Sequence, residues 1–242
     1  MIWFLPTSEQ EATRHTPWVT WTLVVVNVIA FAAMMLGPET TDQWWATYAL
    51  TPAHAQWWQY LTSNFVHADP LHLIGNMVFL IIFGDNVEDV LGPLGFALLY
   101  FLGGLAGDVT FVANNPDMLI PSAGASGCIA TITGAYAVMF FNRAVDLQVF
   151  FLVFPIFSIA VPALLLMLFY FGFDVWLTGS GGGKLGGAGV NYVAHGVGFM
   201  IGVLAGLLAL GSGAVARFRK HREGHALFGY LPWNLGPRSR WR

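Results

Sequence analysis

Apolar residues fill six long stretches of the chain, and shorter polar connectors separate them. Each stretch approaches the roughly 20 residues that a helix needs to cross the hydrocarbon core of a bilayer. We therefore predict an all-α membrane protein, a bundle of six transmembrane helices. The predicted spans lie at about 18–36, 71–91, 94–113, 123–141, 147–170 and 191–211. The membrane domain then covers residues 18–211, between a short tail at 1–17 and a basic tail at 212–242.

Composition supports this interpretation. Of the 242 residues, 56% are hydrophobic and only 10% are charged, whereas soluble domains carry about 25% charged residues. The net charge of −3 and the lack of a basic face exclude a nucleic-acid partner. The single Cys excludes an intramolecular disulfide. The first span is too long for a signal peptide and follows acidic residues, so we expect it to be retained.

Lys and Arg predict the orientation, because they concentrate in cytoplasmic connectors. With the N-terminus inside, nine of these cations lie inside and only Lys184 lies outside. Both termini are thus expected in the cytoplasm. Four Trp residues in the first outer connector, 37–70, are typical of the membrane interface. The last outer connector, "FGFDVWLTGSGGGKLGGAGV", is Gly-rich and fits either a linker or a mobile lid.

Polar side chains occur near the same end of three spans. His72 and Asn76 are four residues apart, which places them on one helix face. Ser126 begins the fourth span, and His195 lies early in the sixth. All three spans start outside, so these residues are expected at similar depth. Polar groups inside a membrane are costly and tend to line a functional site.

Small residues predict that the fourth and sixth spans pack closely. Gly198 and Gly202 follow His195 on one helical face, and Gly124 and Gly127 flank Ser126. Small residues let membrane helices approach each other. This packing would bring Ser126 and His195 into contact at their shared end.

A Ser hydroxyl becomes a nucleophile when a neutral His takes its proton. Free backbone N–H groups at a helix start can stabilise the oxyanion that develops when a peptide carbonyl is attacked. The side chains of His72 and Asn76 could add further donors. Taken singly, however, each feature also fits a packing role or an interhelical hydrogen bond.

Together these residues resemble the rhomboid family of intramembrane serine proteases. The resemblance rests on "HLIGN", "GASG" and "AHGVGFMIG", with the six-span layout. It implies a catalytic dyad in which Ser126 is the nucleophile and His195 the general base. It also implies oxyanion stabilisation by His72 and Asn76, and a substrate gate formed by the fifth span and the loop after it. Pro155 and Pro162 would suit a fifth span that bends.

The chain departs from the family pattern at several positions. Gln59 follows Trp58 where many members have Arg, which puts the anchoring of the first outer loop in doubt. Ala130 stands where some members have an aromatic residue that packs on the catalytic His. Cys128 is expected to be a small apolar filler, and Asp108 has no assigned role.

The predicted function is cleavage of transmembrane segments of membrane proteins near the outer side of the bilayer, without metal or cofactor. The expected location is a cell membrane, and the bare layout suggests a prokaryotic plasma membrane. Two alternatives stay open: a catalytically silent relative that binds membrane helices, and a transporter that uses His and Asn. A transporter's site would lie nearer the midplane. "GASGC" lacks the last Gly of the GxSxG elbow of soluble hydrolases, and no HExxH zinc motif occurs.

Overall fold

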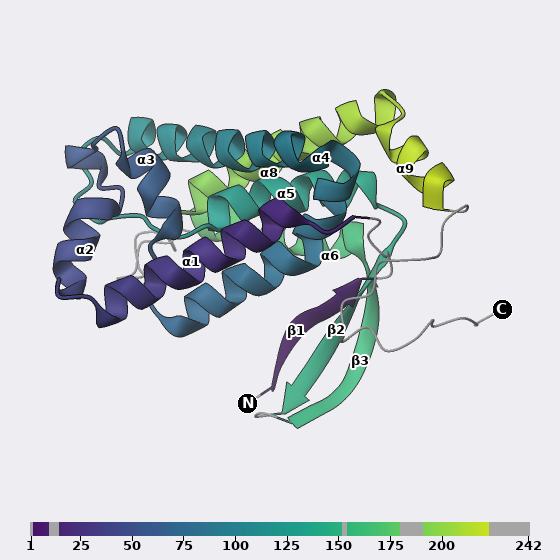
Figure 1. Cartoon of the computed structure of the whole chain (residues 1–242), viewed down its shortest axis with the longest axis horizontal. Helices are drawn as coiled ribbons and strands as arrows, with labels where there is room; N and C mark the ends of the chain where they lie inside the picture. The colour runs from purple at the N-terminus through teal and green to yellow at the C-terminus, as the bar shows by residue number, and fades with distance from the viewer. Residues whose placement is uncertain (1, 10–14, 152–153, 180–190, 223–242) are drawn as a thin grey trace.

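The fold is a helical bundle with a small sheet at one end (Figure 1). The computed structural model describes residues 2–9, 15–151, 154–179 and 191–222. Its helices of eight or more residues are α1 (Trp18–Leu36), α2 (Thr41–Tyr48), α4 (Pro70–Asn114), α5 (Ser126–Met139), α6 (Ala163–Gly179), α8 (Tyr192–Gly211) and α9 (Ala214–Arg222). Short helices α3 (Gln59–Thr62), η1 (Pro52–His54) and η2 (Ser63–Phe65) complete the first connector. The strands are β1 (Ile2–Glu9), β2 (Ala144–Phe151) and β3 (Phe154–Pro162).

The long helix α4 contains the second and third predicted spans. Gly92 interrupts it with a left-handed backbone (φ 72°), and Pro93 follows. Pro starts a helix well because its fixed φ suits the first turn, so the chain reverses here. The two halves lie along the bundle in opposite directions (Figure 1).

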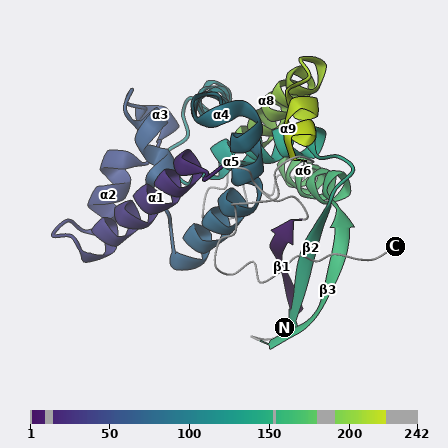
Figure 2. The ribbon, with the colours of Figure 1, turned by 45° about the vertical axis from the view of Figure 1, so that its right-hand side comes forward.

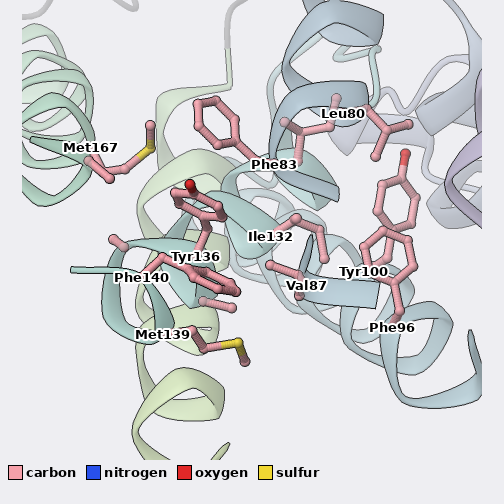
Figure 3. Packing of buried hydrophobic residues seen from close by; sticks show 14 of the residues in the cluster. Leu80, Phe83, Val87, Phe96, Tyr100, Ile132, Tyr136, Met139, Phe140 and Met167 are labelled. Atoms are coloured by element: carbon pink, nitrogen blue, oxygen red, sulfur yellow. The ribbon is translucent and has the colours of Figure 1, made fainter. Parts of the chain in front are cut away.

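α5 lies in the centre of the bundle, where most of its residues are buried. Its Ile132 and Tyr136 meet Phe83 and Val87 of α4 in the main core (Figure 3). The ring centroids of Phe83 and Tyr136 are 5.0 Å apart. An element buried on all sides suits an apolar sequence rich in small residues.

Glycines let α5 and α8 pack backbone against backbone. A Cβ on Gly202 would overlap the Thr131 carbonyl oxygen, and one on Gly198 would lie 2.5 Å from the Gly127 oxygen. A Cβ on Gly134 would in turn overlap the Phe199 carbonyl oxygen. The close contact predicted from the small residues is therefore present.

The predicted fifth span at 147–170 is wrong for its part up to Pro162. Ala144–Phe151 and Phe154–Pro162 are strands, and β1 joins them in the antiparallel order β1-β2-β3. Hydropathy registers the apolar content of this segment but not its period. Val145, Leu147 and Val149 alternate with polar residues, and that period of two is a strand pattern. Pro155 and Pro162 therefore lie in β3 rather than in a bent helix.

The N-terminal segment also differs from the expected polar tail, because Ile2–Glu9 is a strand of this sheet. Its sequence, IWFLPTSE, begins with residues that favour strands. Most of the Gly-rich connector, 180–190, lies outside the described residues, as does most of the C-terminal tail.

Three described helices are long and apolar enough to cross a membrane, and one of them is the two-part α4. α5 has only 14 residues and is about 21 Å long at 1.5 Å per residue. The count of six spans therefore stays a prediction.

Replacing Gly202 by Ala tests the α5–α8 contact. The added methyl would force the two backbones apart, and overpacking of this kind costs about 1–3 kcal/mol. We expect that loss in the free energy of unfolding in detergent micelles. Gly211→Ala in the same helix is the control, since a Cβ there meets nothing within 4 Å. Equal stability of the two variants would contradict close packing at Gly202.

Candidate active site

Ser126 is the first residue of α5, and the loop before it is held by the first connector. Leu50 and Ser122 exchange two backbone hydrogen bonds of 2.9 Å, and the Gly124 N–H donates to the Ser63 carbonyl at 2.9 Å. No side chain caps the N-terminus of α5. Its first-turn N–H groups therefore have no partner within the helix or from a cap, and they lie beside the Ser126 hydroxyl.

His195 lies in the first turn of α8 and meets Ser126. The Ser126 Oγ and His195 Nε2 atoms are 2.7 Å apart, within hydrogen-bond distance. Asn191 caps α8 by accepting a hydrogen bond from the Ala194 N–H at 2.9 Å, which fixes this turn. The ring of Tyr192 packs edge-on against His195, with centroids 6.1 Å apart. Tyr192 thus contacts the imidazole in a site where Ala130 offers no ring.

His72 and Asn76 lie beside Ser126 in the same cavity. Gly124 has φ +121°, and a Cβ there would approach the His72 Nε2 to 2.9 Å. Gly124 therefore lets the loop pass close to His72. Gly127 differs, because a Cβ on it would make only ordinary contact, 3.5 Å from the Ala194 Cβ. Gly127 contributes to the contact between α5 and α8 through its carbonyl oxygen, which lies against Gly198.

His67 is a site residue that the sequence analysis missed. It is fully buried, and its Nε2 lies 2.9 Å from the Asn76 Nδ2. Burial, and then the charge of nearby His72, lower the pKa of His67 from 6.5 to about 4. At neutral pH the ring is therefore uncharged, and Nε2 can accept a hydrogen bond from the Asn76 amide. His67 precedes α4, the helix that carries Asn76, so no helical spacing in the sequence relates the two residues.

The site opens into a cavity of about 680 Å³. Asp108 and Asn191 also line it, and both are more than nine-tenths buried. The Asn191 Nδ2 has no hydrogen-bond partner among the described residues. The structure thus places Asp108 in the lining of the site, in the same cavity as this unused amide donor. The described residues contain no group of three His, Cys, Asp or Glu side chains suited to a metal.

Gln59, which stands where many rhomboid proteins have Arg, anchors the first connector through its own hydrogen bonds. The Gln59 side chain is buried, accepts a hydrogen bond from the Gln56 N–H at 3.0 Å and donates to the Thr47 carbonyl at 3.3 Å. The Trp58 indole donates to the same carbonyl at 3.1 Å.

Cys128 is fully buried, and its Sγ donates to the Asn64 Oδ1 at 3.1 Å. It is therefore more than an apolar filler.

The lowered pKa of His67 predicts a pH-dependent stability. The unfolded chain protonates this ring near pH 6.5 and the folded chain only near pH 4. The unfolded state thus binds more protons between these values, so folding stability falls as the pH is lowered through that window. The full shift corresponds to about 3 kcal/mol.

His67→Gln removes this titration but keeps a side-chain acceptor for Asn76. We expect its free energy of unfolding, measured in micelles from pH 7 to pH 4, to fall by about 3 kcal/mol less than that of the parent. His54→Gln, at an exposed position, is the matched control. Parallel curves for His67→Gln and the parent would contradict a neutral buried imidazole.

Comparison with known proteins shows which family the chain resembles. The Rhomboid domain family matches residues 54–212, more than half of the chain. The chain is 29% identical over 202 residues to Rhomboid-related protein 3 of Homo sapiens. This alignment covers 80% of this chain and 48% of that protein. It is 30% identical over 154 residues to Rhomboid-like protease 3 of Toxoplasma gondii, or 62% of this chain and 56% of the relative.

One relative is named for a lack of activity. The chain is 39% identical over 94 residues to Inactive RHOMBOID-like protein 8 of Arabidopsis thaliana, which is 37% of this chain and 26% of that protein. The chain thus spans about half the length, or less, of these relatives. The match over more than half of its length, together with its apolar helices, shows that this membrane protein belongs to the rhomboid family.

Proposed function

We propose that the protein is an intramembrane serine endopeptidase that cleaves transmembrane segments of other proteins through a Ser126–His195 dyad. The observation that carries this proposal is the distance of 2.7 Å between the Ser126 Oγ and the His195 Nε2. These residues come from two apolar helices and are 69 positions apart in the chain. Polar groups inside a membrane protein are energetically costly, and for that reason they tend to mark functional sites.

The dyad lies below the membrane surface in this proposal. α5 is about 21 Å long, and the hydrocarbon core of a bilayer is about 30 Å thick. If the C-terminal end of α5 lies at the inner interface, Ser126 lies within the outer half of the core. The layout would then have six crossings and both termini in the cytoplasm, in the plasma membrane of a prokaryote.

Acylation would use the hydroxyl and the imidazole in turn. As the Ser126 oxygen attacks the scissile carbonyl carbon, the hydroxyl proton passes to the His195 Nε2. The tetrahedral intermediate then collapses, the C–N bond breaks, and the imidazolium gives its proton to the leaving amine. An acyl ester on Ser126 remains.

The oxyanion would be stabilised by donors that surround Ser126. The uncapped first-turn N–H groups of α5 would be available to donate to the oxygen of the intermediate. The Asn76 amide has a second N–H besides the one directed at His67, and His72 can add a ring N–H. Each donor of this kind typically contributes about 3–4 kcal/mol to transition-state stabilisation.

Water must reach the ester to complete the reaction. The cavity of about 680 Å³ contains polar groups from Asp108, Asn191 and Asn76 that can hold water within the membrane. A water molecule would attack the ester carbonyl as His195 takes its proton. The ester bond then breaks, and the proton returns to the Ser126 oxygen.

A single-pass membrane protein is the substrate class that this site suits. A peptide bond in a helix is shielded by its own hydrogen bonds, so the segment must unwind before attack. Helix-destabilising residues near the scissile bond should therefore favour cleavage. The gate expected from the family resemblance would involve α6 and the connector after it, of which 180–190 lie outside the described residues.

A second candidate is a catalytically silent protein that binds membrane helices. The observation that favours it is the similarity to a relative named as inactive. Such a protein would need the cavity but not the proton transfer between Ser126 and His195.

Cleavage of a single-span reporter by the 242-residue chain in proteoliposomes distinguishes the two candidates. We expect Ser126→Ala and His195→Ala each to lower kcat by about 10⁴-fold or more, because the pair acts as one unit. Ser158→Ala, at an exposed position on β3, is the control and should cleave as the parent does. If the parent leaves the reporter intact but binds it, the silent candidate is favoured; undiminished cleavage by either dyad variant would contradict the mechanism.

A further inference from the structure

Where Val145–Val149 of β2 pairs with Phe157–Val161 of β3, the sheet has one apolar face and one more polar face. In β2 the apolar Val145, Leu147 and Val149 alternate with Asp146 and Gln148. Successive side chains of a strand point to opposite faces, and directly paired residues share a face. The pairs with β3 are Val145–Val161, Leu147–Ile159 and Val149–Phe157 on one face, and Asp146–Ala160 and Gln148–Ser158 on the other.

The sheet lies at the end of the bundle opposite the Ser126–His195 pair. α5 starts at Ser126, and β2 begins shortly after α5 ends. The strands leave the bundle at this end, and the far ends of β2 and β3 point away from the helices in both views (Figures 1 and 2). The base of the apolar face is in the protein core, because Val145 is fully buried there.

Farther along β3 the same face is open. Phe157 is 51% exposed and Ile159 is 46% exposed, although both continue the row that begins at the partly buried Val161. β3 runs directly into α6, whose Leu165, Leu168 and Phe169 are also exposed. The apolar surface of the sheet is therefore continuous with the outer surface of an apolar membrane helix.

We propose that this apolar face rests on the bilayer, so that the sheet lies flat in the headgroup layer on the side of the membrane opposite the dyad. β1 and β3 are edge strands, and within the described part of the chain no further strand pairs with their outer N–H and C=O groups. Unpaired sheet edges do not occur in the hydrocarbon region, because their backbone groups need water or headgroups. An interfacial position satisfies these edges, covers Phe157 and Ile159 with acyl chains, and leaves Gln148 and Ser158 in water.

Charge at the same end favours lipid over a soluble partner. α9 follows α8 at this end, and its Phe218 packs on Phe140 just after α5, with ring centroids 5.8 Å apart. The α9 sequence, AVARFRKHR, carries four Arg and Lys residues and no acidic residue. Basic segments next to membrane helices are attracted to anionic lipid headgroups. A basic helix at the same end of the bundle as an amphipathic sheet thus suits an anionic membrane surface.

Cysteine scanning along β3 tests the proposal, because the only native cysteine, Cys128, is fully buried. A nitroxide label would be attached to the 242-residue chain at one position at a time, through Phe157→Cys, Ser158→Cys, Ile159→Cys or Ala160→Cys. The samples would be lipid nanodiscs that contain one copy and anionic lipid, with the labelled parent as background. Accessibility to oxygen, which dissolves in acyl chains, is compared with accessibility to a water-soluble nickel chelate.

We expect accessibility to alternate with a period of two. Labels at 157 and 159 should favour oxygen, and labels at 158 and 160 should favour the nickel chelate. Preference for the nickel chelate at all four positions would overturn the proposal, because the apolar face would then lie in water. Shielding of 157 and 159 from both reagents would also overturn it, since protein rather than lipid would cover the face. Unfolding temperatures close to that of the parent would establish that each labelled variant keeps its fold.

Discussion

The backbone contact between α5 and α8 is the constraint on which the candidate site depends. Lipid is as apolar as the helices, so no hydrophobic force presses them together, and close packing must supply the attraction. Gly202 and Gly198 allow this by lying against the Thr131 and Gly127 carbonyl oxygens. Because both helices begin at the same end of the bundle, the contact fixes the separation of their first turns. The distance between the Ser126 and His195 side chains follows from that separation.

Polar groups near this contact have partners that orient them. The loop before α5 is tied to the first connector through Leu50 and Ser122, and Asn191 caps α8. His67, buried and neutral, can accept a hydrogen bond from the Asn76 amide and so direct the second N–H of that amide. These contacts suggest a site that is organised before substrate arrives, which is the state that electrostatic stabilisation of a transition state requires.

Much of this arrangement could be predicted from the sequence, because it depends on spacing within helices. The Gly intervals predicted the α5–α8 contact, and the shared end of three spans predicted that Ser126, His195 and His72 would meet. The sheet was missed because a hydropathy window counts apolar residues without their period, and Val145–Val149 alternates as a strand does. His67 was missed because it precedes α4, and only the tertiary fold turns it towards Asn76. The position of Asp108 in the cavity likewise depends on how α4 packs against α8.

The central claim is that the Ser126 hydroxyl is activated by His195. Mass mapping of the covalent adduct formed with a fluorophosphonate tests it most directly, since such reagents capture a serine whose proton a neighbouring base removes. The account predicts an adduct on Ser126 in the parent and none on that residue in His195→Ala. An unmodified Ser126 in the folded parent, or equal modification in the two proteins, would contradict it.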